Sequence, residues 1–312
     1  MTARWPELPY AAWKDTCTTL QLWTQIVGKT RLALTPWLNH SWHVSFEITA
    51  RGLGTPLIHA KELSFQVEFD LVEHLLRLNI GDAVARQFAL RPMPVAEFHE
   101  RFFELLSEAG IAVQIVGRPN EVADATPFRE DRTHASYDPD YANWFWRVLL
   151  ASHEIFLRFR TAFLGKSSPI QFFWGSFDLA VTRFSGRRAP LHPGGVPHLP
   201  DAVVREAYSH EVSSAGFWPG GGPVDFAAFY SYAYPAPQGF PAAKIRPPEA
   251  YFSEPLGEFI LPYDALRNAS DPDKHLMEFL ESTYAAAAEL ADWDRKALEC
   301  AVGALGKPRP VS

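Results

Sequence analysis

The chain has 312 residues, enough for one large domain or two smaller ones, and 47% of them are hydrophobic, as expected of a globular protein with a core. The net charge of −7 argues against nucleic acid as a partner, because phosphate binding needs a basic surface. No stretch approaches 18 uninterrupted apolar residues and the N-terminus has no apolar signal region, so we expect no membrane association. The two cysteines suit a reducing compartment, and we expect a cytoplasmic protein.

The first part of the chain alternates between helical and strand patterns. Trp13, Trp23 and Val27 recur at helical spacing, and Gly28 is a favourable residue for ending that helix. Apolar and polar residues alternate from Trp42 onward, which indicates a strand with one buried face. The expected elements are a helix over 10–27, strands over 42–49, 63–71 and 76–80, a helix over 94–109 and a short strand over 111–116.

The second part begins after a polar stretch, 118–139, that interrupts the periodic pattern. A longer helix over 140–163 is expected to pack between the two parts of the chain. The apolar run from Ile170 predicts a single strand with Phe173 and Phe177 on one face and Trp174 and Asp178 on the other. Further expected elements are strands over 226–234 and 257–261 and a helix over 271–292.

These patterns predict an α+β fold, with antiparallel sheets and packing helices, over a single unit of residues 1–312. The run Trp42–Ile48 is echoed by Trp174–Leu179, and each part places strands before a helix. The chain is therefore compatible with two similar halves, 30–117 and 166–292, joined by the loop and helix of 118–165. Such a duplication would place a ligand site between the halves.

Five segments together resemble an uncharacterised bacterial family of unknown function. They are Trp5–Tyr10, Leu22–Lys29, Glu130–Pro139, Phe173–Arg188 and Glu206–Gly220, so the resemblance covers nearly the whole chain. It implies one full-length architecture and a bacterial cytoplasmic protein. It implies no activity, cofactor or catalytic residue.

The densest group of chemically useful residues lies between 169 and 218. It suggests a protein that binds, and transforms by acid–base catalysis, a small organic molecule, neutral or anionic, in an aromatic-lined cleft. A carboxyl among aromatic rings has its pKa raised, which suits a general base. The opposing interpretation is that Asp178 lies on a solvated sheet face or pairs with an arginine. The expected catalytic residues are Asp178, His210 and His192, and the expected substrate-binding residues are Trp174, Ser176, Arg183, Arg188, Trp218 and Tyr230.

Two alternatives stay open. The same cleft could serve a non-enzymatic sensor or interaction module, which needs shape but no tuned base. The histidines could instead form a mononuclear Zn or Fe centre, so the cofactor is either none or a single metal ion. The adjacent pair His210 and Glu211 would point to opposite faces of a regular strand. The expected metal ligands are His40, His43, His134 and Glu211.

Overall fold

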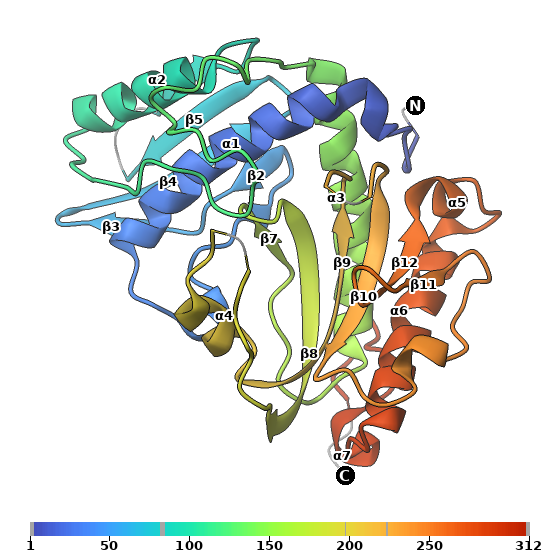
Figure 1. Cartoon of the computed structure of the whole chain (residues 1–312). Coiled ribbons are helices and arrows are strands. Elements are labelled where there is room, and N and C mark those ends of the chain that lie inside the picture. The colour runs from blue at the N-terminus through green and yellow to red at the C-terminus, as the bar shows by residue number, and fades with distance from the viewer. Residues whose placement is uncertain (1–2, 82–84, 197, 223, 310–312) are drawn as a thin grey trace.

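The computed structural model describes residues 3–81, 85–196, 198–222 and 224–309, and in it the chain forms two antiparallel sheets with helices packed around them (Figure 1). The α+β fold expected from the sequence is therefore confirmed. The N-terminal sheet has the strand order β1-β2-β4-β5-β6, with β3 paired to β4. Its strands are β1 (Glu47–Ile48), β2 (Gly52–Gly54), β3 (Ile58–Ala60), β4 (Leu63–Asp70), β5 (Leu75–Ile80) and β6 (Arg86–Ala89).

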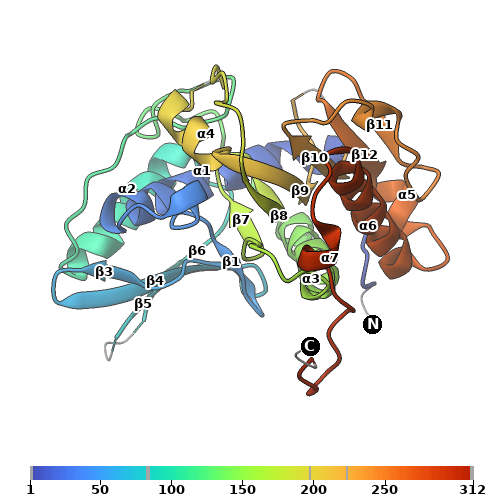
Figure 2. The ribbon, with the colours of Figure 1, turned by 90° about the horizontal axis from the view of Figure 1, so that it is seen from below.

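The C-terminal sheet has the order β11-β12-β10-β9-β8-β7. Figure 2 shows it beside the N-terminal sheet, with α3 and α6 packed on the same face of it. Its strands are β7 (Gln171–Phe173), β8 (Asp178–Arg188), β9 (His210–Trp218), β10 (Ala228–Tyr234), β11 (Tyr251–Ser253) and β12 (Glu258–Pro262). The helices of the fold are α1 (Tyr10–Leu34), α2 (Val95–Glu108), α3 (Pro139–Thr161), α4 (Asp201–Ala207), α5 (Tyr263–Arg267), α6 (Pro272–Leu290) and α7 (Arg295–Leu298), with 3₁₀ turns η1 (Asn39–Ser41) and η2 (Phe240–Ala242).

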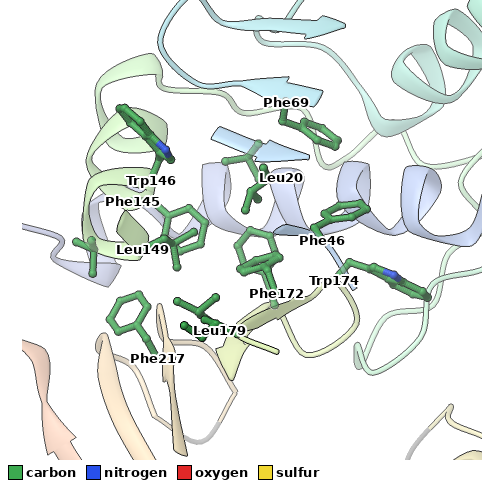
Figure 3. Close-up of a cluster of buried hydrophobic side chains, with 14 of the residues drawn as sticks. Leu20, Phe46, Phe69, Phe145, Trp146, Leu149, Phe172, Trp174, Leu179 and Phe217 are labelled. Atoms are coloured by element: carbon green, nitrogen blue, oxygen red, sulfur yellow. The ribbon is translucent and has the colours of Figure 1, made fainter. Parts of the chain in front are cut away.

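Helix α3 contacts both sheets, as the sequence predicted for the helix over 140–163. Asp138 caps its first turn by accepting hydrogen bonds from two backbone N–H groups, and Pro139 occupies the first helical position. Figure 3 shows Phe145, Trp146 and Leu149 of α3 beside Phe46 and Phe172. All five belong to one continuous hydrophobic cluster that extends through both sheets. Each buried side chain of this size contributes on the order of 2 kcal/mol to folding.

Helix α1 continues through Gly28 to Leu34, so the expected stop at Gly28 is wrong. The reason is a packing contact across the fold. A Cβ atom at Gly28 would lie only 2.3 Å from the indole nitrogen of Trp174. Glycine is therefore needed inside this helix to make room for the Trp174 ring. Gly28, which the sequence suggested as the end of the helix, instead marks the point where the Trp174 ring packs against the helix backbone.

The strand expected over 42–49 is mostly absent, because only Glu47–Ile48 forms a strand there. His40 and Ser41 both have left-handed backbone angles, with φ of 59° and 58°, and they turn the chain just before the alternating segment. Phe46 instead forms an isolated antiparallel bridge with Phe172, which joins the two sheets. The expected strands over 63–71 and 76–80 are present as β4 and β5, whereas residues 111–116 form no regular strand.

The apolar run from Ile170 forms a hairpin and not one strand. Strands β7 and β8 pair in antiparallel fashion around a turn, where Phe177 has a φ of 60° and its N–H donates to the Phe173 carbonyl over 2.8 Å. Trp174 and Ser176 therefore lie in the turn, and Asp178 is the first residue of β8. The turn places the carboxyl of Asp178 at one end of the sheet.

The two faces of the C-terminal sheet differ in character. One face is apolar and packs against α3 and α6, with buried residues such as Leu179, Val181, Phe217 and Phe229. The pairing register places small, polar and tyrosine side chains on the other face, which we call the tyrosine face. The tyrosine face includes Asp178, Thr182, Ser214, Gly216, Trp218, Tyr230, Tyr232, Tyr234 and Glu258.

In the part of the chain that the structure describes, no helix has the length and hydropathy needed to cross a membrane.

Candidate functional site

The centre of the candidate site is the carboxyl group of Asp178, at the start of β8. The residue is only 7% exposed. Its two carboxyl oxygens accept short hydrogen bonds from the Ser176 hydroxyl and the Tyr230 hydroxyl. Burial raises the pKa of Asp178, and these two hydrogen bonds oppose the rise by stabilising the carboxylate. The result is a desolvated acid held in one orientation.

Tyr230 reaches Asp178 from β10, two strands away, because the intervening strand carries a glycine. The pairing register puts Gly216 of β9 between Ala180 of β8 and Tyr230 of β10. A Cβ atom at Gly216 would lie 2.3 Å from the Tyr230 hydroxyl oxygen and 2.4 Å from the Leu179 carbonyl oxygen. The absent side chain allows the tyrosine ring to lie flat across β9.

Two more tyrosines extend this arrangement along the sheet. The rings of Tyr230 and Tyr232 stack with centroids 6.1 Å apart and planes inclined by 16°. The hydroxyl groups of Tyr232 and Tyr208, the latter just after α4, are 3.0 Å apart. Burial raises the pKa of all three phenols, so they are neutral hydrogen-bonding groups at physiological pH.

Two further carboxyl groups approach the tyrosine face. Glu258 begins β12, where the register places it beside Tyr232. Burial raises the pKa of Glu258 to about 7, and the negative charge of Asp178 raises it further. The same two causes raise the pKa of Glu121 to about 7, against the lowering effect of Lys29. Because Glu121 is exposed at the surface, solvent screening weakens the upward shift of its pKa more than it weakens that of the half-buried Glu258.

The loop that carries Glu121 is fixed by a polar stripe on α1. Gln25 binds the backbone of Asn120 twice, accepting from its N–H over 2.7 Å and donating to its carbonyl over 2.9 Å. Lys29, one turn further along α1, donates to the Asn120 side chain. Glu121 itself has a φ of 56°, a strained angle for a residue with a side chain.

The hairpin turn before Asp178 is held from the same helix. Gln21 of α1 donates to the Gly175 carbonyl over 2.7 Å. A Cβ atom at Gly175 would lie 2.1 Å from a carboxyl oxygen of Glu121, so the glycine lets this carboxyl come close to the turn. Helix α1 therefore positions both the Glu121 loop and the Asp178 turn.

Lys29 is buried behind this loop. Its ammonium group lies 5.7 Å from the centroid of the Trp174 ring. Burial lowers the pKa of Lys29 to about 8, and the charge of Glu121 raises it. The positive charge of Lys29 thus partly compensates the negative charge of Glu121.

Among the residues predicted from the sequence, the structure brings three together directly: Asp178, Ser176 and Tyr230. Trp218 lies on the same face, at the end of β9 next to the start of β8. The Trp174 side chain, in the turn itself, is buried, and its indole N–H donates to the Val44 carbonyl over 2.8 Å. Trp174 therefore anchors the turn that precedes Asp178.

The two predicted catalytic histidines do not contact Asp178. His210 lies at the opposite end of β9, paired with Arg188, eight residues from Trp218. At about 3.3 Å per residue, that separation is roughly 25 Å. His192 stacks on Tyr208, with ring centroids 4.9 Å apart, so it contacts only the far end of the tyrosine cluster.

The predicted anion-binding arginines also lie elsewhere. Arg183 alternates onto the apolar face of the sheet, where its guanidinium carbon lies 3.4 Å from the centroid of the Phe159 ring and it donates to the Phe159 carbonyl. Burial lowers the pKa of Arg183 to about 10. Arg188 is exposed near the far end of β8. Neither residue can hold a ligand against Asp178.

The four predicted metal ligands occupy separate surroundings. His40 contacts the Ala207 carbonyl, His43 accepts from the Leu38 N–H, His134 binds Asp131, and Glu211 pairs with Arg187. Within the described ranges, no three His, Cys, Asp or Glu residues are arranged to hold a metal ion. In this structure the four side chains make hydrogen bonds and ion pairs in separate places.

Sequence reasoning missed Glu121, Glu258, Lys29 and Tyr208 as members of the site. Glu258 stands in a short alternating strand, and its neighbour Tyr232 was visible in a row of alternating tyrosines. That alternation predicts a shared face, and Glu258 would have been found once β10 and β12 were paired. Glu121 lies in an irregular polar segment, and no local signal distinguishes it.

The structure also contains a surface cavity of about 670 Å³ on the other side of the C-terminal sheet, between η2 and α6. Its lining combines alanines with Lys244, Arg246, Ser282 and Glu289. Its lining residues include one carboxyl group, Glu289, and do not form a group of neighbouring carboxyls and tyrosines like that on the tyrosine face. Volume alone does not make it the better candidate for chemistry.

The fold and this group define an α+β protein with two antiparallel sheets, one of which presents the buried carboxyl of Asp178 and the half-buried carboxyl of Glu258 among tyrosines. The chain belongs to a family of unknown function, DUF5996, whose match covers residues 5–300. The resemblance seen in the sequence is thereby confirmed. No curated protein and no solved structure matches the chain.

Proposed function

We propose that the tyrosine face binds a small organic cation, a compound with a basic nitrogen, and that its carboxyl groups exchange a proton with this ligand. The supporting observation is that the charge of Asp178 raises the pKa of both Glu121 and Glu258, which approach the same face of the sheet. None of the three forms an ion pair with an arginine or lysine among the described residues. Lys29 compensates the charge of Glu121 in part, and a ligand cation would supply the positive charge that Asp178 and Glu258 lack.

The magnitude of the attraction favours a cation over an anion. A unit charge 4 Å from a carboxylate near a protein surface gains about 4 kcal/mol, and an anion would lose a similar amount. The rings of Tyr230, Tyr232 and Trp218 add about 0.5–2 kcal/mol each where the cation lies over a ring face. The proposed ligand is therefore opposite in charge to the one that Arg183 and Arg188 suggested from the sequence.

The acid–base part rests on the division of roles among the carboxyl groups. Asp178 already accepts two hydrogen bonds and is fixed in place, so it orients and neutralises the ligand. Burial and the charge of Asp178 raise the pKa of Glu258 to about 7, where a group can both accept and return a proton at neutral pH, and the same causes raise the pKa of the more exposed Glu121. A bound cation stabilises the carboxylate form and lowers both pKa values, so binding releases protons and strengthens as the pH rises through 7.

The test is isothermal titration calorimetry with benzylamine, benzyl alcohol and benzoate, which share a ring and differ in charge. We expect binding of the amine only, with proton release measured by comparing buffers of different ionisation enthalpy. Asp178→Asn should weaken amine binding at least tenfold, about 1.4 kcal/mol, and Glu254→Gln, in an exposed turn, should leave it unchanged. Preferential binding of benzoate, or equal amine binding by Asp178→Asn, would overturn the proposal.

A second candidate is a sensor that binds the same cation without converting it. The observation in its favour is that each oxygen of the Asp178 carboxyl already accepts one hydrogen bond, from Ser176 or Tyr230, which suits recognition more than proton abstraction. Nuclear magnetic resonance of the amine after prolonged incubation with the protein separates the two candidates. Exchange or chemical change of the protons next to nitrogen supports conversion, and an unchanged ligand supports sensing.

A further inference from the structure

A second group of polar residues, independent of Asp178, lies near the opposite end of the C-terminal sheet. The ammonium nitrogen of Lys166 is 2.6 Å from Nε2 of His40. The other ring nitrogen, Nδ1, is 2.9 Å from the Ala207 carbonyl oxygen. Because a carbonyl oxygen can only accept, Nδ1 carries the ring hydrogen and Nε2 is left as the acceptor for Lys166.

His40 is held firmly in this orientation. Its backbone has a left-handed φ of 59°, and its backbone N–H donates to the Glu206 carboxylate over 2.8 Å. Both partners, Glu206 and Ala207, belong to the last turn of α4. The ring also packs against Phe184, with centroids 4.8 Å apart and planes inclined by 44°. A histidine fixed in this way presents Nε2 in one direction.

Lys166 is accessible to solvent, and neighbouring groups hold its side chain in one orientation. The residue is exposed, and its ammonium nitrogen lies 5.2 Å from the Trp42 ring centroid and 4.7 Å from that of Phe184. The backbone of Lys166 is fixed as well, because its carbonyl accepts from the Phe184 N–H over 3.0 Å. Lys166 has no ion-pair partner within 4.0 Å among the described carboxylates, unlike Lys274, which pairs with Glu278. Its hydrogen-bonding partner is a neutral base.

We propose that Lys166 is a nucleophilic amine that forms an imine with a small aldehyde or ketone, with His40 as the proton acceptor. The rings of Trp42 and Phe184 favour a carbonyl compound with a flat apolar group. Nothing in this proposal depends on the tyrosine face, because the two groups lie at different ends of the sheet.

The step balances without any further reactant. Nε2 of His40 takes a proton from the Lys166 ammonium, and the freed nitrogen lone pair attacks the carbonyl carbon. The C=O π electrons move to oxygen, which takes the proton back from His40 to give a carbinolamine. His40 next takes the second proton from the positively charged nitrogen and passes it to the hydroxyl, which leaves as water while the nitrogen lone pair forms the C=N bond, and the product is a protonated imine.

The electrostatics of the surrounding groups agree with this geometry. Burial lowers the pKa of Lys166, and the charge of Glu206 raises it. Burial also lowers the pKa of His40, as do the charges of Lys166 and His210, while the Ala207 carbonyl and Glu206 raise it. His40 is therefore neutral at pH 7.5 and able to accept a proton.

The test is reductive trapping with benzaldehyde and sodium cyanoborohydride at pH 7.5, followed by peptide mass spectrometry over all eight lysines of the chain. We expect Lys166 to be modified at least tenfold faster than the exposed Lys14 and Lys244 in the same sample. This comparison needs no variant, so it stays decisive even if a substitution prevents folding.

His40→Gln should slow the modification of Lys166 by about tenfold or more without changing Lys14, and His59→Gln, an exposed histidine of β3, should change neither. Asp178→Asn should leave the Lys166 rate intact, which separates this proposal from that for the tyrosine face. Modification of Lys166 no faster than Lys14, or an undiminished rate in folded His40→Gln, would show that the Lys166–His40 contact is only structural.

Discussion

The raised pKa of Glu258 gives a direct test of the tyrosine face through stability. Burial and the charge of Asp178 raise the pKa of this carboxyl to about 7 in the folded protein. In the unfolded chain the ordinary value is about 4.3. The folded state therefore binds a proton more tightly than the unfolded state, so stability is greatest below the unfolded pKa and is lost as the pH rises through about 7.

The size of the effect follows from the two pKa values. Each pKa unit is worth about 1.4 kcal/mol, so deprotonation of Glu258 costs up to about 4 kcal/mol of folding free energy above pH 7, and less to the extent that solvent screens the half-buried carboxyl. Glu258→Gln mimics the neutral acid at every pH. We expect the variant to match the natural protein near pH 4.5 and to exceed its free energy of unfolding by up to about 4 kcal/mol at pH 8.

Denaturation with urea, monitored by tryptophan fluorescence at half-unit steps from pH 4.5 to pH 8, measures this difference. Glu254→Gln on the neighbouring exposed turn is the matched control, and its difference from the natural protein should stay small throughout. A constant difference between Glu258→Gln and the natural protein, or a variant that is less stable at pH 8, would refute the assignment of Glu258 as a desolvated acid.

Three substitutions test the packing behind the site, each by urea denaturation. Gly28→Ala should destabilise the protein by about 1–3 kcal/mol, because the added Cβ would lie 2.3 Å from the Trp174 indole. Alanine is the better helix former by about 1 kcal/mol, so a gain in stability would contradict that contact. Gly216→Ala should cost a similar amount by displacing the Tyr230 ring, and a neutral result would mean that the ring does not lie over β9. Tyr230→Phe should cost about 1–3 kcal/mol by leaving the buried Asp178 carboxyl with one partner fewer, and in Asp178→Asn the same change should cost measurably less.

Elements whose partners lie within the same segment were predictable from the sequence. Strand β4 alternates buried Phe65, Val67 and Phe69 with less buried residues, and the alternation alone located it to within a residue. The tyrosine row of β10 followed in the same way, because every second side chain of a strand shares a face. Local periodicity carries this information whatever the strand pairs with.

Elements decided by distant contacts were not predictable. A glycine at position 28 ends a helix or admits a ring, and only the position of Trp174, nearly 150 residues later in the chain, selects the second meaning. The alternation from Trp42 likewise indicated a strand, yet the left-handed angles of His40 and Ser41 direct the segment to a single bridge with Phe172. Tertiary contacts override local preference in both cases.

The site shows the same division at the level of single residues. Asp178 and Tyr230 were each identifiable by residue type and strand position, but their contact depends on Gly216, a residue on a third strand whose contribution is the absence of a side chain. Glu121, which the sequence did not indicate, is positioned by a loop that Gln25 of α1 anchors. The sequence pattern of α1 indicates only an ordinary core helix. Because a site of this kind depends on pairing between strands and on the space that small residues leave open, residue types alone indicated His210 and Arg183. The register of the sheet brings in Glu258 instead, and the loop anchored by Gln25 brings in Glu121.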